Sequence, residues 1–186
     1  MIGNSHYKGI DKLANPERDA TLLYDAFRRL GFEQVQLVID GSRAATVLAL
    51  KSFAEAAANA DWAVVYYAGH GIEFDGSNYL VPVDVKYDQD ADIPKESVAL
   101  DQVLNAVAGA AKFRLVILDA CRENPFVPEM TKSDNSTIGR RSCTHRAGVG
   151  NACRLRYQTR SNGNRWRWPR RSICTCVSSA DGNAGP

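Results

Sequence analysis

Cysteine is scarce in the first part of this chain, and long apolar runs are absent throughout. Of the five cysteines among 186 residues, only Cys121 lies within residues 1–130. A single thiol excludes a disulfide framework for this part and indicates a reducing compartment. No apolar run reaches the roughly 20 residues that a membrane span requires, and the N-terminus has no signal-peptide pattern. These absences predict a cytoplasmic protein without a membrane partner.

Charge divides the chain near Met130. Residues 1–130 contain 12 Lys+Arg and 19 Asp+Glu, whereas residues 131–186 contain 11 and 2. The second part is rich in arginine, holds the other four cysteines and shows no apolar periodicity. We therefore predict one patterned domain over residues 1–130, followed by a basic, Arg/Cys-rich tail over residues 131–186.

Three interpretations of this tail stay open: a disordered basic segment, an Arg/Trp contact for nucleic acid, or a segment translated out of frame. The third rests on the break in composition and on Arg165-Trp166-Arg167-Trp168. Tryptophan has only the codon TGG, so a shift by one base allows Asp-Gly-Asp-Gly at this place. A nucleic-acid partner is the least favoured of the three interpretations.

Apolar spacing over residues 1–120 alternates between strand and helix patterns. It predicts helices over residues 16–30, 43–59 and 100–111, and strands that include Ile2–Ser5, Val35–Ile39 and the apolar runs Trp62–Gly71 and Arg114–Arg122. The pair Asp75-Gly76 predicts a hairpin over residues 74–80. Strands that alternate with helices indicate an α/β fold with a mostly parallel sheet flanked by helices.

Two of these strands lead directly into reactive side chains. One block is Tyr67-Ala68-Gly69-His70-Gly71 and the other is Leu118-Asp119-Ala120-Cys121-Arg122. Because parallel strands end at one edge of a sheet, we expect His70 and Cys121 to lie close together. An imidazole that takes the proton of a thiol makes it a nucleophile. The sequence therefore predicts His70 as base, Cys121 as nucleophile, and the backbone N–H groups of Gly71 and Cys121 as oxyanion donors.

Each residue also fits a simpler role when it is taken alone. A histidine between glycines can merely end a strand, and free cysteine is among the most buried residue types. The catalytic interpretation depends on the two blocks occurring together on matched strands.

The paired blocks resemble the active-site blocks of caspase-like cysteine peptidases, the p20-type domain of bacterial caspase homologues and metacaspases. His70 and Cys121 are 51 residues apart (121 − 70), and a histidine about 50 residues upstream of the cysteine is typical of caspases. The resemblance covers about residues 1–128 and extends to three further segments: Ile2-Gly3-Asn4-Ser5, Leu13-Ala14-Asn15-Pro16 and Leu80-Val81-Pro82-Val83-Asp84.

This resemblance implies a caspase-like three-layer sandwich and a catalytic domain over residues 1–130. It also implies a cysteine-type endopeptidase that acts on peptide or protein substrates through a thioester acyl-enzyme on Cys121. Two departures from the family predict a truncated sandwich: the first strand is cut short, and no further strands follow the cysteine block. The alternative function is a catalytically inactive caspase-like interaction or regulatory domain, since a fold does not guarantee an activity.

Asp119 and an acidic loop complete the candidate residues. Caspases have Gln-Ala-Cys where this chain has Asp119-Ala120-Cys121, and the resemblance to metacaspases implies that Asp119 lines a pocket selective for Arg or Lys. The alternative is that Asp119 accepts local backbone hydrogen bonds. Calcium is a second implication, because some similar enzymes are activated by it and the loop holds Asp84, Asp88, Asp90 and Asp92. Their spacing does not match an EF-hand, so we expect a solvated loop and no cofactor.

Overall fold

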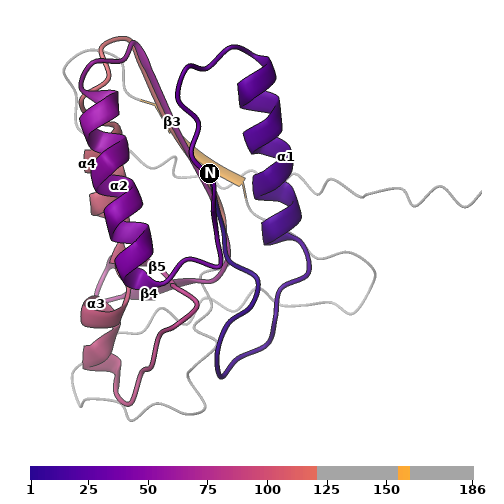
Figure 1. The fold of residues 1–186 in the computed structure, drawn as a ribbon. Coiled ribbons are helices and arrows are strands. Elements are labelled where there is room, and N and C mark those ends of the chain that lie inside the picture. The colour runs from indigo at the N-terminus through magenta and orange to yellow at the C-terminus, as the bar shows by residue number, and fades with distance from the viewer. Residues whose placement is uncertain (121–154, 160–186) are drawn as a thin grey trace, which may run out of the picture.

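A central five-stranded sheet organises the structure, a computed structural model that describes residues 1–120 and 155–159 (Figure 1). The strand order is β2-β1-β3-β7-β8. Strands β1 (Ile2–Gly3), β2 (Val38–Ile39), β3 (Trp62–Ala68) and β7 (Phe113–Asp119) are parallel to their neighbours, and β8 (Leu155–Thr159) runs antiparallel to β7. The α/β class and the mostly parallel sheet predicted from the sequence are therefore confirmed.

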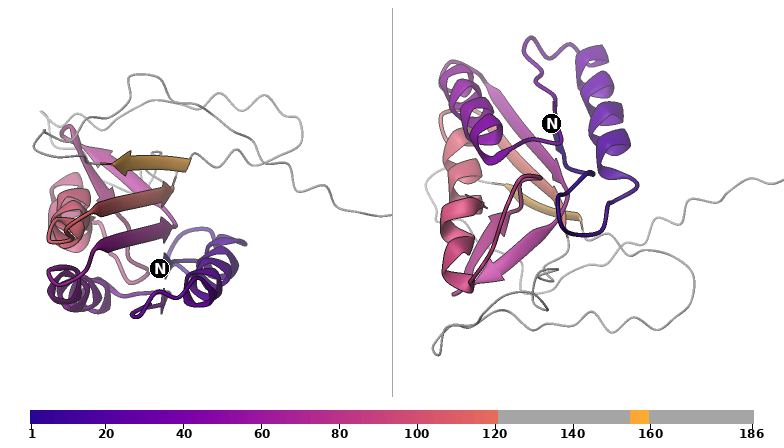
Figure 2. Two further views of the ribbon diagram at one scale, coloured as in Figure 1. Left: turned by 90° about the horizontal axis from the view of Figure 1, so that it is seen from above. Right: turned by 60° about the horizontal axis from the view of Figure 1, so that its bottom comes forward.

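Helices cover both faces of this sheet (Figure 2). Helix α1 (Pro16–Arg29) lies on one face, and α2 (Arg43–Ala57) and α4 (Leu100–Val107) lie on the other. A second, antiparallel sheet of β4 (Gly71–Phe74), β5 (Ser77–Leu80) and β6 (Val98–Ala99) follows β3 at its carboxyl end. The short helices η1 (Asp90–Asp92) and α3 (Ile93–Glu96) precede β6.

Strands β3 and β7 are the longest pair and set the register of the sheet. Their partners run from Trp62 opposite Phe113 to Ala68 opposite Asp119. Both sequences are nearly continuous apolar runs, as expected of parallel strands that are covered by helices on both faces. The two strands therefore end side by side, and the residues that follow them emerge at the same edge.

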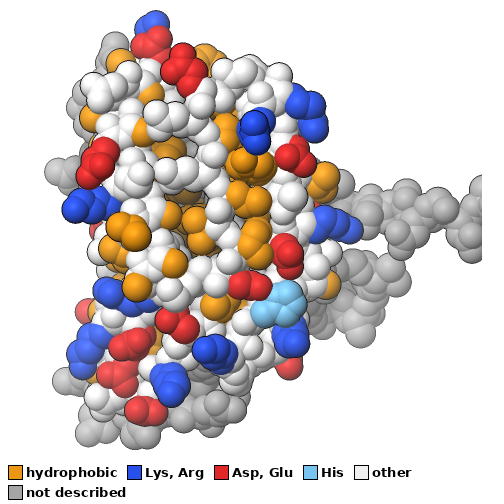
Figure 3. Space-filling model, viewed as in Figure 1, with side chains coloured by type: hydrophobic (Ala, Val, Ile, Leu, Met, Phe, Trp, Pro, Cys, Tyr) orange, Lys and Arg blue, Asp and Glu red, His pale blue; other side chains and the backbone are white. Residues whose placement is uncertain are grey.

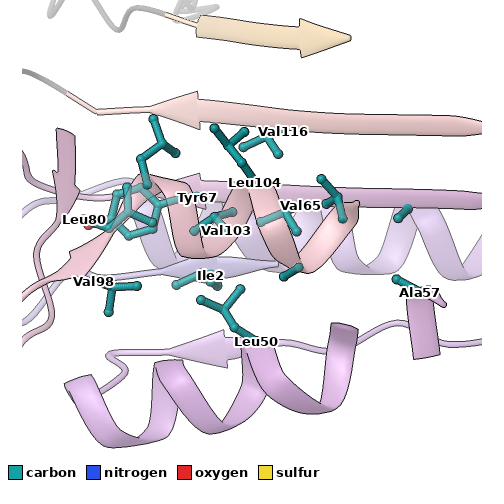
Figure 4. Close-up of a cluster of buried hydrophobic side chains, with 14 of the residues drawn as sticks. Ile2, Leu50, Ala57, Val65, Tyr67, Leu80, Val98, Val103, Leu104 and Val116 are labelled. Atoms are coloured by element: carbon teal, nitrogen blue, oxygen red, sulfur yellow. The ribbon is translucent and has the colours of Figure 1, made fainter. Parts of the chain in front are cut away.

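The main core lies between the sheet and the pair α2 and α4 (Figure 4). It combines strand residues such as Val65, Tyr67 and Val116 with helix residues such as Leu50 and Val103. A smaller cluster under α1 contains Ala20, Tyr66 and Ala68. Because alternate residues of β3 point to opposite faces, Tyr66 packs toward α1 and Tyr67 toward the main core.

The elements differ from the sequence predictions mainly at their ends. Strand β2 has two residues instead of the five of Val35–Ile39, because its partner β1 offers only Ile2 and Gly3 for pairing. Helices α2 and α4 end at Ala57 and Val107, short of residues 59 and 111. The Asp75-Gly76 turn joins β4 to β5 as predicted, with φ of 47° and 72°.

Strand β8 was not predicted. Its backbone pairs Leu155 with Asp119 and Thr159 with Leu115. Cys121 and most of the basic tail lie outside the described residues, so the interpretations of the tail stay predictions. No helix in the described part of the chain is long and apolar enough to cross a membrane.

An apolar hollow lies between α1 and α2, where orange side chains gather in Figure 3. It encloses about 60 Å³ and is lined by residues that include Met1, Phe27, Phe53 and Trp62. Ligand pockets for small molecules usually measure ~300 Å³ or more. Because Trp62 begins β3, this hollow lies toward the amino ends of the strands, away from the edge where His70 emerges.

Candidate active site

The carboxyl edge of the sheet is built around the buried side chain of Asn4, directly after β1. Its backbone N–H donates to the Ala68 carbonyl at 2.9 Å. Its Nδ2 donates to the Val81 carbonyl at 3.0 Å, and its Oδ1 accepts the Gly41 N–H at 3.0 Å. Asn4 thus ties the ends of β1, β3 and β5 to the chain after β2.

His70 lies two residues beyond the last paired residue of β3, and its backbone is held on both sides. The His70 N–H donates to the hydroxyl of Tyr7 at 2.8 Å. The His70 carbonyl accepts from the Tyr67 hydroxyl at 2.6 Å and from the Val81 N–H at 3.1 Å. The backbone N–H and the backbone C=O of His70 therefore both have hydrogen-bond partners.

The imidazole of His70 is largely buried and packs against the ring of Tyr7. The two ring centroids are 4.6 Å apart and the planes are tilted by 59°. Burial lowers the pKa of His70, while a hydrogen bond to the Asp11 backbone and the charge of Asp11 oppose this shift. Its Nε2 is buried and has no hydrogen-bond partner among the described residues. The ring is thus held neutral near pH 7 with one acceptor nitrogen unused.

Gly69 and Gly71 flank His70, and their backbone N–H groups point in different directions. The Gly69 N–H donates to the Asp119 carbonyl at 3.2 Å, which extends the β3–β7 ladder by one bond. Gly71 is opposite Leu80 in the β4–β5 hairpin, and the Val81 N–H bonds the His70 carbonyl. In an antiparallel ladder this pattern makes Gly71 and Leu80 a non-hydrogen-bonded pair. The Gly71 N–H is therefore directed away from β5.

Asp119 ends β7 with a half-buried carboxylate on the same face as α1. Its Oδ2 accepts from the Tyr66 hydroxyl at 3.4 Å, and Ile117, two residues earlier, packs into the cluster under α1. Tyr66 and Asp119 come from neighbouring strands, so the carboxylate has a side-chain partner. The hydrogen bond from the Gly69 backbone goes to the backbone carbonyl of Asp119 and not to its carboxylate.

The structure does not describe Cys121, so its distance from His70 is not fixed here. The sequence places Cys121 two residues after Asp119, and His70 lies two residues after Ala68. Ala68 and Asp119 are register partners. His70 and Cys121 therefore each follow, by two residues, a member of the same register pair of β3 and β7.

Sequence reasoning missed Tyr7 and the hydroxyl of Tyr67 as parts of this site. Tyr67 was visible in the histidine block, but as an apolar strand residue. Tyr7 is 5% exposed although its neighbours His6 and Lys8 are exposed. The only signal that the sequence offers for Tyr7 is a single aromatic residue in a polar loop. Such a residue forms no periodic pattern, so its burial could not be predicted.

Three described side chains could offer ligand atoms to one cation. They are His6, Glu17 and Asp40, whose candidate ligand atoms lie within 4.8 Å of one another at the surface. The acidic loop is different, since Asp84 accepts the Arg43 N–H at 2.9 Å and Asp92 accepts the Gln89 N–H at 3.1 Å. No group from this loop meets the same spacing in the described part of the chain. The absence of a cofactor stays a prediction, with calcium as the alternative to it.

Comparison with known proteins gives two matches. The model of the caspase domain family matches residues 1–184, which extends beyond the segments whose resemblance was recognised above. The human mucosa-associated lymphoid tissue lymphoma translocation protein 1 is 34% identical over 84 residues. This alignment covers 45% of the chain and 10% of the human protein, so the chain corresponds to a small part of that relative.

Proposed function

Because this chain belongs to the caspase domain family, a family of cysteine peptidases, we propose that it is a cysteine-type endopeptidase with Cys121 as nucleophile and His70 as base. The observation that carries the proposal is the buried Nε2 of His70, which has no partner among the described residues. An unused acceptor on a neutral, fixed imidazole at the carboxyl edge of a parallel sheet is what a general base requires.

The reaction follows from these two residues. His70 takes the proton of the Cys121 thiol, and the sulfur attacks the carbonyl carbon of the scissile peptide bond. The protonated His70 then gives its proton to the leaving amine, so that the C–N bond breaks and a thioester remains on Cys121. A water molecule, deprotonated by His70, attacks the thioester, and release of the acid restores the thiol.

The oxyanion of each tetrahedral intermediate needs two aligned donors. The Gly71 N–H suits this role because the β4–β5 ladder directs it away from β5. The second proposed donor is the backbone N–H of Cys121. Because both donors belong to the backbone, neither requires a side chain that could change its rotamer.

Cleavage after Arg or Lys is the specificity that we propose. The support is the half-buried carboxylate of Asp119, two residues before Cys121. A carboxylate held by the Tyr66 hydroxyl can accept a bidentate pair of hydrogen bonds from a guanidinium group. The same carboxylate would repel a substrate side chain that is itself acidic.

Cleavage of fluorogenic peptides that end in Arg, Lys or Asp tests this function on the full chain. We expect turnover of the Arg and Lys peptides, with a loss of 10³-fold or more, on the order of other catalytic dyads, in Cys121→Ala and His70→Ala. His145→Ala is the matched histidine control and Cys143→Ala the matched thiol control. Asp119→Asn should lower kcat/KM for the Arg peptide by about tenfold or more while the fold is kept.

Two results would contradict the proposal. Full activity in Cys121→Ala would show that Cys121 is not the nucleophile. A folded wild-type chain whose Cys121 reacts with a peptide-directed thiol probe no faster than Cys143 would favour the alternative of an inactive caspase-like interaction domain.

A further inference from the structure

Tyr7 contacts His70 both through a hydrogen bond and through its ring, yet the proposed chemistry does not use it. It lies in the loop after β1, 63 residues before His70 in the sequence. Its hydroxyl accepts the His70 N–H at 2.8 Å, and its ring lies against the imidazole at 4.6 Å between centroids. One side chain therefore contacts both the backbone and the ring of the candidate base.

The hydroxyl of Tyr7 belongs to a buried polar group with Tyr67 and Asn4, through side-chain hydrogen bonds. Tyr67 in turn holds the His70 carbonyl at 2.6 Å. The two tyrosines thus hold the His70 backbone on both sides of its Cα atom, Tyr7 at the N–H and Tyr67 at the C=O. Burial raises the pKa of Tyr7 to about 12, so its hydroxyl keeps its proton across the neutral range.

The loop that carries Tyr7 is fixed on both sides. Before it, Asp40 accepts the Ser5 N–H at 2.7 Å and the His6 N–H at 2.9 Å. After it, the Lys8 N–H donates to the Val83 carbonyl at 3.0 Å. Because backbone bonds anchor its neighbours, Tyr7 has a defined position from which it can hold another residue.

We propose that Tyr7 is a positioning residue that holds the backbone and imidazole of His70 in one orientation and so keeps Nε2 available to the reacting thiol. This inference rests on the proposed role of His70 as base. Without the Tyr7 hydroxyl, the His70 N–H would lie in a largely buried place with no acceptor. The peptide unit would then shift to find water or another acceptor, and the imidazole would move with it.

The test compares Tyr7→Phe with Tyr24→Phe in the full chain. Both variants lose one phenolic hydroxyl, but the partner of the Tyr24 hydroxyl among the described residues is Arg28, at 3.2 Å, on the exposed side of α1. The first measurement is the titration of His70 by NMR of histidine-labelled protein, with the signal assigned by its loss in His70→Ala. The second measurement is kcat and KM for the Arg-ended peptide, and circular dichroism monitors the fold.

We expect the pKa of His70 to rise toward its ordinary value of 6.5 in Tyr7→Phe, because a freed imidazole meets more water. We also expect kcat to fall roughly fivefold with KM within about twofold, since one hydrogen bond that orients the base is lost. Tyr24→Phe should leave both quantities unchanged.

The NMR titration separates this inference from the proposed function. If the wild-type chain cleaves no peptide, the function fails, while the His70 titration still reports on Tyr7. An unchanged His70 titration in folded Tyr7→Phe overturns the inference, whatever the activity. Should Tyr7→Phe unfold, hydrogen exchange of the wild-type His70 amide replaces it: slow exchange supports the bond to Tyr7, and exchange at the rate of an open amide overturns it.

Discussion

Gly69 shows how one residue without a side chain brings the candidate base to its place. Its φ is +155°, and a Cβ atom there would lie 2.5 Å from the Tyr7 hydroxyl and 2.7 Å from the Tyr67 hydroxyl. The chain therefore passes close against two tyrosine hydroxyls immediately before His70. Both tyrosines are buried, so neither can move aside to admit a methyl group.

We predict that Gly69→Ala destabilises the fold by about 2 kcal/mol or more, from backbone strain together with overpacking. The matched control is Gly76→Ala, which also has a positive φ, of +72°, but nothing within 4 Å of the added Cβ. The control should cost only about 1 kcal/mol. Urea unfolding of both variants measures the difference, and equal losses would show that the tyrosine contacts do not matter.

Helix α2 illustrates how a single element is fixed at its start. The Ser42 hydroxyl accepts the Ala45 N–H at 3.1 Å, and Asp84 accepts the Arg43 N–H at 2.9 Å. Two of the N–H groups at the beginning of the helix are thereby satisfied by side chains. The second of these bonds also ties the helix to the loop that follows β5.

Ser42→Ala should lower the free energy of unfolding by about 1 kcal/mol, because the Ala45 N–H loses its acceptor. Ser52→Ala, in the exposed part of the same helix, should change it by less than about 0.5 kcal/mol. Chemical denaturation of the two variants under one condition provides the comparison. A loss in Ser52→Ala equal to that in Ser42→Ala would contradict the role of the cap.

Elements of seven residues or more were predictable because each carries its own signal. Apolar periodicity located α1, α2 and α4, continuous apolar runs located β3 and β7, and the Asp75-Gly76 turn located the β4–β5 hairpin. The two-residue strands β1, β2 and β6 exist only through partners far away in the sequence, so the boundaries of β2 were wrong. Helix ends are also hard to predict. Asparagine is a common N-cap residue, but the side chain of Asn15 makes no capping hydrogen bond at the start of α1.

In the candidate site, too, residues on strongly patterned strands could be predicted and contacts made by a loop could not. His70 and Asp119 could be located because each follows or ends a strand with a strong pattern. The contacts of Tyr7, Tyr67 and Asn4 could not, since they depend on how the loop after β1 folds over the ends of β3 and β5.

For the whole molecule, titration of buried groups limits the pH range of highest stability. Burial lowers the pKa of His70 below 6.5, so its contribution is present above pH 6.5 and is lost on acidification. Burial works to raise the pKa of Asp40, but hydrogen bonds from His6 and Ser5 and the ion pair with His6 outweigh it and lower the pKa below 3.8. Its contribution is lost as the pH falls below that value.

Alkaline pH acts through the tyrosines. Burial raises the pKa of Tyr7 from 10.0 to about 12 and also raises the pKa of Tyr67 well above 10.0, so the folded chain resists their ionisation. Their contribution is complete below pH 10 and is lost as the pH rises above it. We predict a plateau in the urea midpoint from about pH 7 to about pH 10, with a fall on either side. A Tyr7→Phe chain should lose part of the alkaline fall, and an unchanged alkaline limb would contradict this assignment.

The pairing of Ala68 with Asp119 has a consequence for the time at which the carboxyl edge of the sheet can assemble. The two residues are 51 positions apart, so β3 leaves the ribosome well before the strand that must lie beside it. Closing so large a loop is slow relative to local folding, and parallel pairing cannot begin until residue 113 has emerged. A nascent chain that already exposes His70 therefore has no assembled edge at which a peptide bond could be held. The order of the elements thus delays assembly of this edge of the sheet until synthesis has passed β7.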